Sequence, residues 1–404
     1  MTKLGMFRGI AILAVVLNHA ATHGMTALTW WANDFGRTGA ASDLSWLDTP
    51  GYWALMSLKH LAQFCVPLFL FCSGFYVAYS WRAASSGLWA VVKASLRGLF
   101  IPFAFWSIIS IALYLIEIRF SPSGRALDLS GFIEQRMKDY NFVPVLAELL
   151  LLVPLVVRLG ARRPLHILAM MLALQVANSA LMYARYAIPP QDTEFLSALQ
   201  QVNRWNWAFF PRLGFFFFLG FYVARHYRSV QLRLWSLRWP LIAAVLAFGC
   251  LSIGEAHALQ SIDGNYWDDE AWKASTFFYT LAVLAALLAW DLRRGWLARM
   301  LDRIGVQSYG IYLVHPIATV YADTVLSHAI GHYAWARALF PVVVVVAAVG
   351  IPWLVMWSVA HSPARRYFRI LFGAGTGALD RPLGRISIPL PAAMRKLAVM
   401  RQPG

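Results

Sequence analysis

An arginine and a histidine, Arg8 and His19, stand eleven residues apart in the first apolar segment of the chain. In a helix, eleven steps return the histidine to within about 20° of the arginine's face, roughly 16 Å farther along the axis. The residues between them are apolar apart from Asn18. Ionisable groups are costly in such surroundings, so they usually face a protein interior or polar cavity and indicate a function.

Basic and hydroxyl side chains occur in two further apolar stretches. Ser73 stands beside a glycine in QFCVPLFLFCSGFYVAYSWR, which ends at Arg82. Taken alone, that stretch favours a helix kinked at its proline and closely packed. Lys93 and Arg97 lie four apart in KASLRGLFIP and share one face if the stretch is helical. With Arg8 and Arg82 they can bind a phosphorylated ligand on the cytoplasmic side. The excess of basic residues that membrane proteins carry on their cytoplasmic side is an alternative explanation for most of these residues. It explains Arg8 and Arg97 less well, because they adjoin or enter apolar sequence.

A second intramembrane histidine, His315, lies in SYGIYLVHPI, which also holds Tyr309. A single buried histidine is more often a hydrogen-bonded core residue than a catalyst. His19 and His315 at similar depth favour a shared site, because no opposite charge lies in either segment. Glu148 and Asp323 are acids within the apolar spans. Glu148 can orient a histidine or bind substrate, whereas Asp323 is near enough to the outer end to be solvated.

Metal and nucleotide motifs are missing from the sequence. Two histidine pairs have the i, i+4 spacing of metal sites, His19 with His23 and His328 with His332, but neither has a matched third ligand. No P-loop, Rossmann glycine pattern or nucleophile elbow occurs. We therefore predict no metal site. The three cysteines lack metal-site spacing and are predicted to pack structurally: Cys65, Cys72 and Cys250.

The composition is that of a membrane protein. The chain of 404 residues is 59% hydrophobic and 13% charged, whereas a soluble domain is about a quarter charged. We predict an all-α, polytopic membrane helix bundle of about ten transmembrane helices. The predicted spans are 6–22, 53–80, 98–117, 142–158, 164–184, 208–225, 240–255, 275–290, 304–326 and 338–360.

The net charge of +16 is distributed as a topology signal. One side of the predicted bundle, counted as its loops and the adjoining span ends, holds 24 of the 35 Lys and Arg residues and only three acids. The positive-inside rule then places both termini in the cytoplasm, with membrane lipids rather than nucleic acid as partners. A cleaved signal peptide is rejected, because cleavage would remove Arg8 and His19. We predict one membrane domain, 1–364, and a basic cytoplasmic tail, 365–404.

The predicted outward loops, about 23–52, 118–141, 185–207 and 256–274, combine aromatic and acidic residues. Aromatic rings stack on the apolar faces of sugars, and carboxylates accept hydroxyl protons. An interfacial aromatic belt explains any single one of these residues better. The residues concerned are Trp30, Trp31, Trp46, Tyr52, Trp53, Trp205, Trp207, Tyr266 and Trp267, with Asp263, Asp268, Asp269 and Glu270.

Taken in order, these segments resemble the acyltransferase-3 family, bacterial integral-membrane O-acyltransferases that act on surface glycans. The resemblance covers about residues 5–365. One departure lies in NFVPVLAELL, which lacks the tryptophan of the family's Leu-Trp-Phe-Leu element, close to Glu148. The matching elements are Arg8 to His19, Val66 to Phe75, the basic stretch ending at Pro102, Tyr309 to Pro316, and the mid-chain span Arg212 to Arg225.

The resemblance implies a reaction and roles for these residues. The donor is acyl-CoA, acetyl-CoA by default, as a co-substrate and not a bound cofactor. The acceptor is a hydroxyl of a surface polysaccharide or lipid-linked glycan. His19 is the expected base, or the residue that passes the acyl group on. Arg8 holds the CoA phosphates or pantetheine, or stabilises charge on the thioester oxygen. Lys93 and Arg97 bind the phosphates.

In the same scheme Ser73 and Tyr309 line the pocket, and His315 positions His19 or a substrate. Some family members carry a second, extracytoplasmic transferase domain. None is expected here, so the chain either acylates its glycan directly or passes the acyl group to another protein. A transporter of a lipid-linked sugar fits intramembrane Arg and His residues and broken helices as well. Dependence on acyl-CoA distinguishes the two functions, and a sensor or scaffold ranks behind both.

Overall fold

The computed structural model describes residues 3–35, 48–83, 87–120, 128–160, 163–187, 210–263, 272–290, 295–330 and 334–375. Within these ranges every regular element is a helix, which confirms the all-α prediction. In the described part of the chain, six helical segments are long and apolar enough to cross a membrane, with α2 and α3 counted together as Pro50–Arg82. There are seven if α5 and α6, bent by 64° relative to each other, count as one span. The prediction of ten spans exceeds this number. The cytoplasmic position of the termini stays a prediction.

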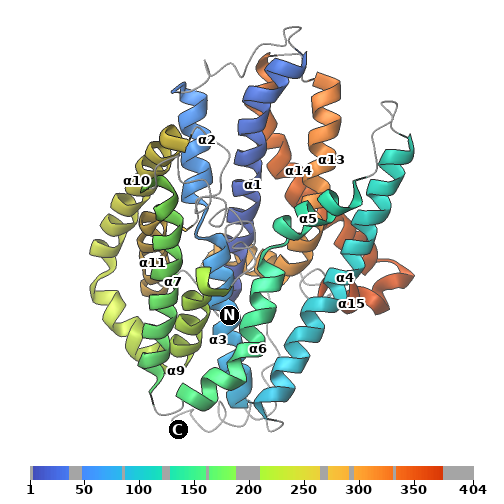
Figure 1. Cartoon of the computed structure of the whole chain (residues 1–404). Helices are drawn as coiled ribbons and strands as arrows, with labels where there is room; N and C mark the ends of the chain where they lie inside the picture. Colours follow the sequence, from blue (N-terminus) through green and yellow to red (C-terminus); the bar gives the residue numbers. More distant parts are fainter. Residues whose placement is uncertain are drawn as a thin grey trace.

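Figure 1 shows the helices, with α1 in the middle of the bundle between α10 and α4. Their bounds are α1 Lys3–Phe35, α2 Pro50–Leu61, α3 Cys65–Ala83, α4 Leu88–Phe120, α5 Leu129–Asp139, α6 Phe142–Gly160, α7 Pro164–Ala187, η1 Phe210–Arg212, α9 Gly214–Ser236, α10 Arg238–Asp263, α11 Ala274–Ala289, α12 Trp296–Val306, α13 Ser308–Ile330, α14 Ala334–Ala360, η2 Pro363–Tyr367 and α15 Phe368–Phe372.

Burial separates the inner helices from the outer ones. In the apolar segment of α1, 67% of the residues are buried, and in that of α2 with α3 the share is 72%. In the apolar segments of α4, α7 and α10 only 17% of the residues are buried. Apolar faces that stay exposed in α4, α7 and α10 suit contact with lipid. The helices that carry Arg8, His19 and Ser73 are therefore interior, where polar side chains must meet protein groups or cavities.

Glycines set the two closest helix crossings. A Cβ at Gly74 of α3 would collide with the Phe217 carbonyl oxygen of α9, and a Cβ at Gly220 would collide with the Phe71 carbonyl oxygen of α3. At the crossing of α1 with α12, a Cβ at Gly9 would collide with the Leu301 carbonyl oxygen. Small residues let backbones approach in this way within membrane bundles. The second crossing fixes the turn that carries Arg8.

Pro67 bends the chain less than the sequence suggested. The predicted span 53–80 is broken at residues 62–64, between α2 and α3, and Pro67 lies in the first turn of α3. Proline is tolerated there because the missing N–H would have no helical partner. The break leaves Gln63 in a short turn between two helices, at the level of His19.

The short amphipathic helix α12 carries a buried acid against α1. Asp302 is 1% exposed, and its Oδ2 has no hydrogen-bond partner within the described residues. Its other carboxylate oxygen occupies the place where a Cβ on Gly5 would lie. Burial raises the pKa of Asp302 above its ordinary value.

We expect Asp302→Asn to stabilise the protein at pH 7. A carboxyl with a raised pKa in the folded state stabilises while protonated, and this contribution is lost as the pH rises through that pKa. Asparagine does not titrate, so its advantage should grow with pH and fade towards about pH 4, near the pKa of an unfolded aspartate. Thermal unfolding in detergent between pH 4 and 8 measures the difference. A melting temperature that is lower for the variant at pH 7 would contradict this account.

The chain after α14 folds back onto the bundle. Trp106 Nε1 donates to the Leu371 carbonyl oxygen (2.9 Å), and Gln307 Nε2 donates to the Gly375 carbonyl oxygen (3.3 Å). Phe368 and Phe372 are buried in the main core. Residues 365–375, predicted as the start of the tail, thus pack against α4 and α13. The rest of the predicted tail, 376–404, lies outside the described residues.

Most of the aromatic and acidic loop residues also lie outside the described residues. His332 does too, and nothing is described of the side chain of His328. Of the predicted aromatic group, Trp30 and Trp31 lie in α1, where their side chains are not described, and Tyr52 and Trp53 lie in α2. Tyr52 donates to or accepts from His257 Nδ1 (2.9 Å), and Trp53 packs against the same ring. Both belong to α2 packing rather than to a free loop.

Candidate active site

Two cavities lie at successive levels along α1. The Arg8 cavity, about 300 Å³, is lined by Arg8, Phe69, Ser73, Tyr76, Val77, Ser80, Ser95, Gly98, Leu99, Phe142, Leu146, Leu150, Ser308, Tyr309, Tyr312 and Gly373. The His19 cavity, about 70 Å³, is lined by Val15, Asn18, His19, Gln63, Cys65, Val66, Pro67, Lys138, Asp139, Asn141, Val145, Arg212, Leu213 and Tyr312. Helices α1, α3, α6 and α13 each contribute residues to both cavities.

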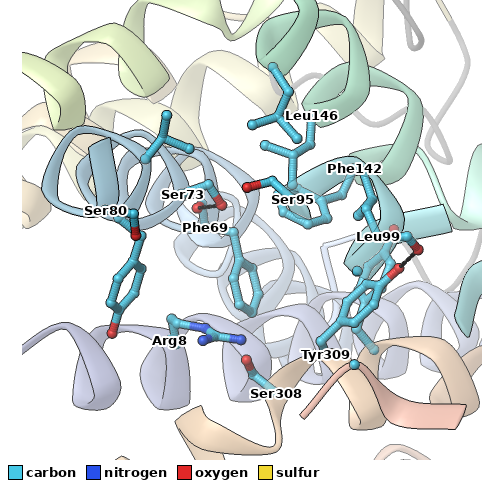
Figure 2. Close-up of a pocket in the computed structure, with 16 residues that line it drawn as sticks. Arg8, Phe69, Ser73, Ser80, Ser95, Leu99, Phe142, Leu146, Ser308 and Tyr309 are labelled. Atoms are coloured by element: carbon cyan, nitrogen blue, oxygen red, sulfur yellow. Dashed lines mark hydrogen bonds between the residues drawn. The ribbon is translucent and has the colours of Figure 1, made fainter. Parts of the chain in front are cut away.

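The Arg8 cavity has one charge and many hydroxyls. Arg8 is the single charged residue among the described residues that line it. Figure 2 shows Arg8, Ser73, Ser308 and Tyr309 placed around the space. The Ser73 and Ser95 hydroxyls donate to carbonyl oxygens of their own helices, at 2.8 and 2.9 Å, so their oxygens can still accept. A cation with surrounding hydroxyls suits an anionic or amide-rich ligand.

The His19 cavity is smaller and more polar. Its lining includes an amide from each of three elements, Asn18, Gln63 and Asn141, beside the charged Asp139 and Arg212. Asn18 Nδ2 donates to the Lys59 carbonyl oxygen (3.0 Å), which ties α1 to α2 at this level. Amides and charges of both signs suit recognition of hydroxyl-bearing groups.

His19 and His315 meet at the His19 cavity, as their shared depth predicted. Their ring centroids are 5.2 Å apart and their planes are tilted by 54°. His19 is half-buried and lines the cavity, whereas His315 is 1% exposed and lies behind it. The accessible ring is therefore His19, and His315 is its inner neighbour.

Pro316 explains the orientation of His315. Proline has no N–H, so it leaves the carbonyl of Tyr312, four residues earlier, without its helical donor. His315 Nδ1 lies 2.7 Å from that carbonyl oxygen, which requires Nδ1 to carry the proton. The His315 Nε2 is then an acceptor, and it is buried without a hydrogen-bond partner within the described residues. The His-Pro pair thus locks one ring beside His19.

The structure places the other predicted site residues in two groups. Ser73 and Tyr309 line the Arg8 cavity, and Tyr309 donates to the Leu99 carbonyl oxygen (2.5 Å). Arg82, Lys93 and Arg97 are exposed and are not among the lining residues. Lys93 Nζ lies 5.6 Å from the centre of the Trp89 ring. Lys93 and Arg97 nevertheless flank Ser95 and Gly98, which do line the cavity.

Glu148 lies at neither histidine. Its Oε2 accepts a hydrogen bond from the Phe210 main-chain N–H (2.9 Å), at the start of the short helix η1. Because η1 carries Arg212, this contact helps to hold Arg212 at the His19 cavity. Through this hydrogen bond Glu148 anchors the start of η1 to α6.

We therefore expect Glu148→Gln to keep acyl-transfer activity within about threefold of wild type, whereas loss of a general base costs roughly 10²–10⁴-fold. Glutamine retains an oxygen that can accept from Phe210. Glu148→Leu removes it and should lower stability by about 1 kcal/mol. Initial rates and melting temperatures of both variants check this. A hundredfold loss in Glu148→Gln would instead assign Glu148 a direct role.

Four lining residues were not predicted from the sequence: Tyr312, Lys138, Asp139 and Asn141. Tyr312 is one turn before His315 in a segment already singled out, so its spacing was a usable signal. The other three meet His19 through the bend between α5 and α6, which no local pattern indicates. Within the described ranges, no group of three or more His, Cys, Asp or Glu side chains is placed to hold a metal ion.

A family model described as an acyltransferase domain, Acyl_transf_3, matches residues 2–357. Both cavities and both histidines fall within this range, apart from the contribution of Gly373 to the Arg8 cavity. No curated protein and no solved structure matches the chain.

Proposed function

We propose, from the premise that this chain belongs to the acyltransferase-3 family, that it is a membrane O-acyltransferase whose donor is acyl-CoA. The acyl group is acetyl, and the acceptor is a hydroxyl of a cell-surface polysaccharide or lipid-linked glycan. The observation that carries the proposal is the position of His19. It lies at the wall of a polar cavity, beside His315 and one level beyond the Arg8 cavity.

In this proposal the donor occupies the Arg8 cavity. Arg8 and His19 are eleven residues apart in one helix, which separates them by roughly 16 Å along the axis. Arg8 therefore binds the pantetheine arm or the phosphates and not the reacting thioester. The exposed Lys93, Arg97 and Arg82 receive the remaining phosphates. Lys93 and Arg97 are close in sequence to Ser95 and Gly98, which line the cavity, and Arg82 is two residues after Ser80, which also lines it. Charge-assisted hydrogen bonds to phosphate are among the strongest such contacts.

The reaction balances with the groups at hand. His19 takes the proton of the acceptor hydroxyl as its oxygen attacks the thioester carbonyl carbon. The carbon–sulfur bond then breaks, and the proton passes from His19 to the departing thiolate, which leaves as the free thiol. His315 keeps the His19 ring in place from behind, through the contact at 5.2 Å. No metal takes part in this scheme.

The proposal puts the protein in the inner membrane as a multi-pass protein, with the mouth of the Arg8 cavity towards the cytoplasm, where acyl-CoA is made. The acceptor reaches His19 from the opposite side. Membrane lipids are the other expected partners. Family membership does not favour the transporter alternative.

Mass spectrometry of surface glycans tests the function in cells. A deletion strain is compared with strains complemented by the wild-type gene and by His19→Ala. The proposal expects deletion to remove an acetyl increment that only the wild type restores. Loss of the entire glycan would instead support a carrier of lipid-linked sugars. An unchanged glycan profile in all strains would exclude a surface polysaccharide as the acceptor.

A further inference from the structure

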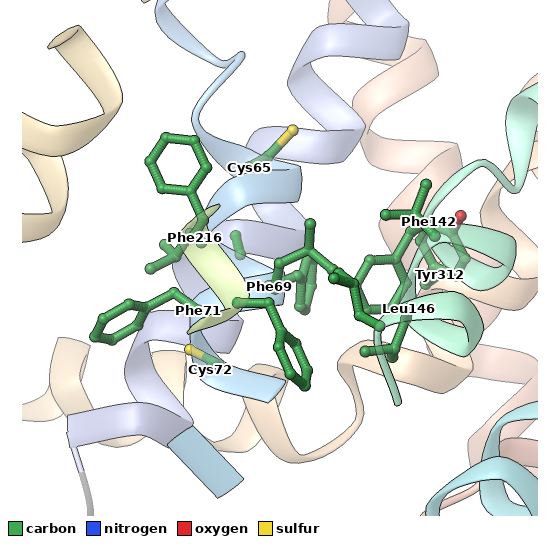
Figure 3. Packing of buried hydrophobic residues seen from close by; sticks show 14 of the residues in the cluster. Cys65, Phe69, Phe71, Cys72, Phe142, Leu146, Phe216 and Tyr312 are labelled. Carbon is green, nitrogen blue, oxygen red and sulfur yellow. The ribbon is translucent and has the colours of Figure 1, made fainter. Parts of the chain in front are cut away.

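Three buried aromatic side chains pack together beside the two cavities, and we call them the aromatic septum: Phe69 of α3, Phe142 of α6 and Tyr312 of α13 (Figure 3). Phe69 and Phe142 have ring centroids 5.6 Å apart, as do Phe142 and Tyr312. All three are buried, with exposures of 7%, 6% and 4%. Phe69 and Phe142 line the Arg8 cavity only, and Tyr312 lines both cavities.

The order of residues along the helices supports this division. On α3, Cys65 and Val66 line the His19 cavity, and Ser73 and Tyr76 line the Arg8 cavity. On α1 the order is reversed, from Arg8 to His19. Both helices thus pass from one cavity to the other at the level of the septum.

Tyr312 differs from its two neighbouring tyrosines. The Tyr140 hydroxyl donates to the Leu313 carbonyl oxygen (2.8 Å), and the Tyr309 hydroxyl donates to the Leu99 carbonyl oxygen (2.5 Å). The Tyr312 hydroxyl is buried and makes no hydrogen bond within the described residues. The Phe142 main-chain N–H approaches it without meeting hydrogen-bond geometry. A buried hydroxyl without a partner is costly and calls for a ligand or a function.

We propose that Tyr312 is the gate between the cavities and the hydrogen-bond donor to the reacting carbonyl. This inference rests on the proposed acyl transfer. The acyl end of a donor in the Arg8 cavity reaches the septum, and rotation of the Tyr312 ring admits it to His19. The hydroxyl then donates to the thioester carbonyl oxygen, on which negative charge develops as the acceptor oxygen bonds to carbon. Tyr312 transfers no proton.

Tyr312→Phe tests the hydroxyl because it keeps the ring. We expect kcat to fall roughly tenfold to a thousandfold, with the KM for acetyl-CoA unchanged, since a lost donor to a developing oxyanion costs up to about that factor. Tyr140→Phe is the matched control. It loses a hydroxyl from the same aromatic cluster, 5.9 Å from Tyr312 between ring centroids, and should keep its kcat. Equal losses in both variants, or none in Tyr312→Phe, would overturn the role of the hydroxyl.

Thiol labelling tests the gate without any need for catalysis. Cys65 lines the His19 cavity, and Cys72→Ala with Cys250→Ser leaves it as the one thiol of the chain. A membrane-impermeant methanethiosulfonate is applied to each face of vesicles in turn. We expect Tyr312→Ala, and the milder Tyr312→Leu, to label at least roughly tenfold faster than the wild type from the face on which the Arg8 cavity opens. Labelling from the other face should not change.

The two readouts separate failure of this inference from failure of the proposed function. Faster labelling in a protein that transfers no acyl group would support the gate and reject the donor role of the hydroxyl. Unchanged labelling in both Tyr312→Ala and Tyr312→Leu, with melting temperatures showing folded protein, would overturn the gate. A normal kcat in Tyr312→Phe would likewise overturn the donor role, whatever the labelling shows.

Discussion

Replacing His19 with alanine should lower the rate of acyl transfer by roughly 10²–10⁴-fold while the protein inserts and folds normally. A sugar hydroxyl is a weak nucleophile until a base takes its proton, and His19 is the accessible imidazole of the pair at the His19 cavity. His315 cannot replace it, because it is 1% exposed and its Nδ1 is held by the Tyr312 carbonyl oxygen.

The control for His19 is its neighbour one turn later in α1. His23 Nδ1 lies 3.1 Å from Asp323 Oδ2, away from both cavities. His23→Ala should therefore retain a rate close to that of wild type. Thiol release from acetyl-CoA, measured with a cell-envelope acceptor fraction, gives the rates, and membrane yield and melting temperature report folding. A His19→Ala rate within threefold of wild type would remove His19 from the chemistry.

Replacing Gly74 with valine should abolish folded protein. The added Cβ would meet the Phe217 carbonyl oxygen, and α9 cannot withdraw without also losing the reciprocal contact of Gly220 with the Phe71 carbonyl. Backbone must move at such a crossing, so the cost should exceed the roughly 1–3 kcal/mol typical of an overpacked core. Ser73 and Phe69 lie on the same stretch of α3, so any surviving protein should also have a distorted Arg8 cavity.

Gly254→Val is the matched control for Gly74→Val. Gly254 lies in α10, where a Cβ would meet no atom within 4 Å. The same substitution should then cost only the difference in helix propensity, below about 1 kcal/mol. Size-exclusion profiles and melting temperatures in detergent compare the two variants. Equal behaviour of both, whether folded or aggregated, would show that the crossing of α3 with α9 is not the tight contact described.

The sequence predicted the helical class and much of what lines the cavities, for physical reasons. Long apolar segments in a chain of 13% charge have few alternatives to membrane helices. Arg8 and His19 share one face of a helix, and ionisable side chains avoid lipid. That face was therefore expected to point into the helix bundle. Ser73 and Tyr309, selected from their segments, line the Arg8 cavity, and His315 meets His19.

The features that the sequence did not predict depend on contacts between segments far apart in the chain. The predicted span 53–80 agrees with the candidate membrane span Pro50–Arg82, but it did not predict the turn at residues 62–64, which brings Gln63 to the His19 cavity. Lys273 had no predicted role, yet it is fully buried and its Nζ donates to the Ser252 carbonyl oxygen (2.9 Å). Such burial follows from the packing of α10 on α11, which no periodicity in either helix reveals.

The junction of α5 with α6 shows the same limit. The bend of 64° between α5 and α6 carries Asp139 and Asn141 to His19. Local sequence predicts a helix boundary there at most, since bends of this kind are decided by what packs on each side. Glu148 was likewise predicted to orient a histidine or bind substrate, but its observed contact is a hydrogen bond accepted from the Phe210 main-chain N–H.

The most direct test of the account is a structure of the protein with a non-hydrolysable thioether analogue of acetyl-CoA. We predict density in the cavity of about 300 Å³, with the pantetheine arm beside Arg8 and the acyl end against Phe69, Phe142 and Tyr312. Its phosphates should lie near Lys93 and Arg97. An analogue bound elsewhere, or an empty Arg8 cavity at saturating analogue, would contradict the assignment of this cavity to the donor.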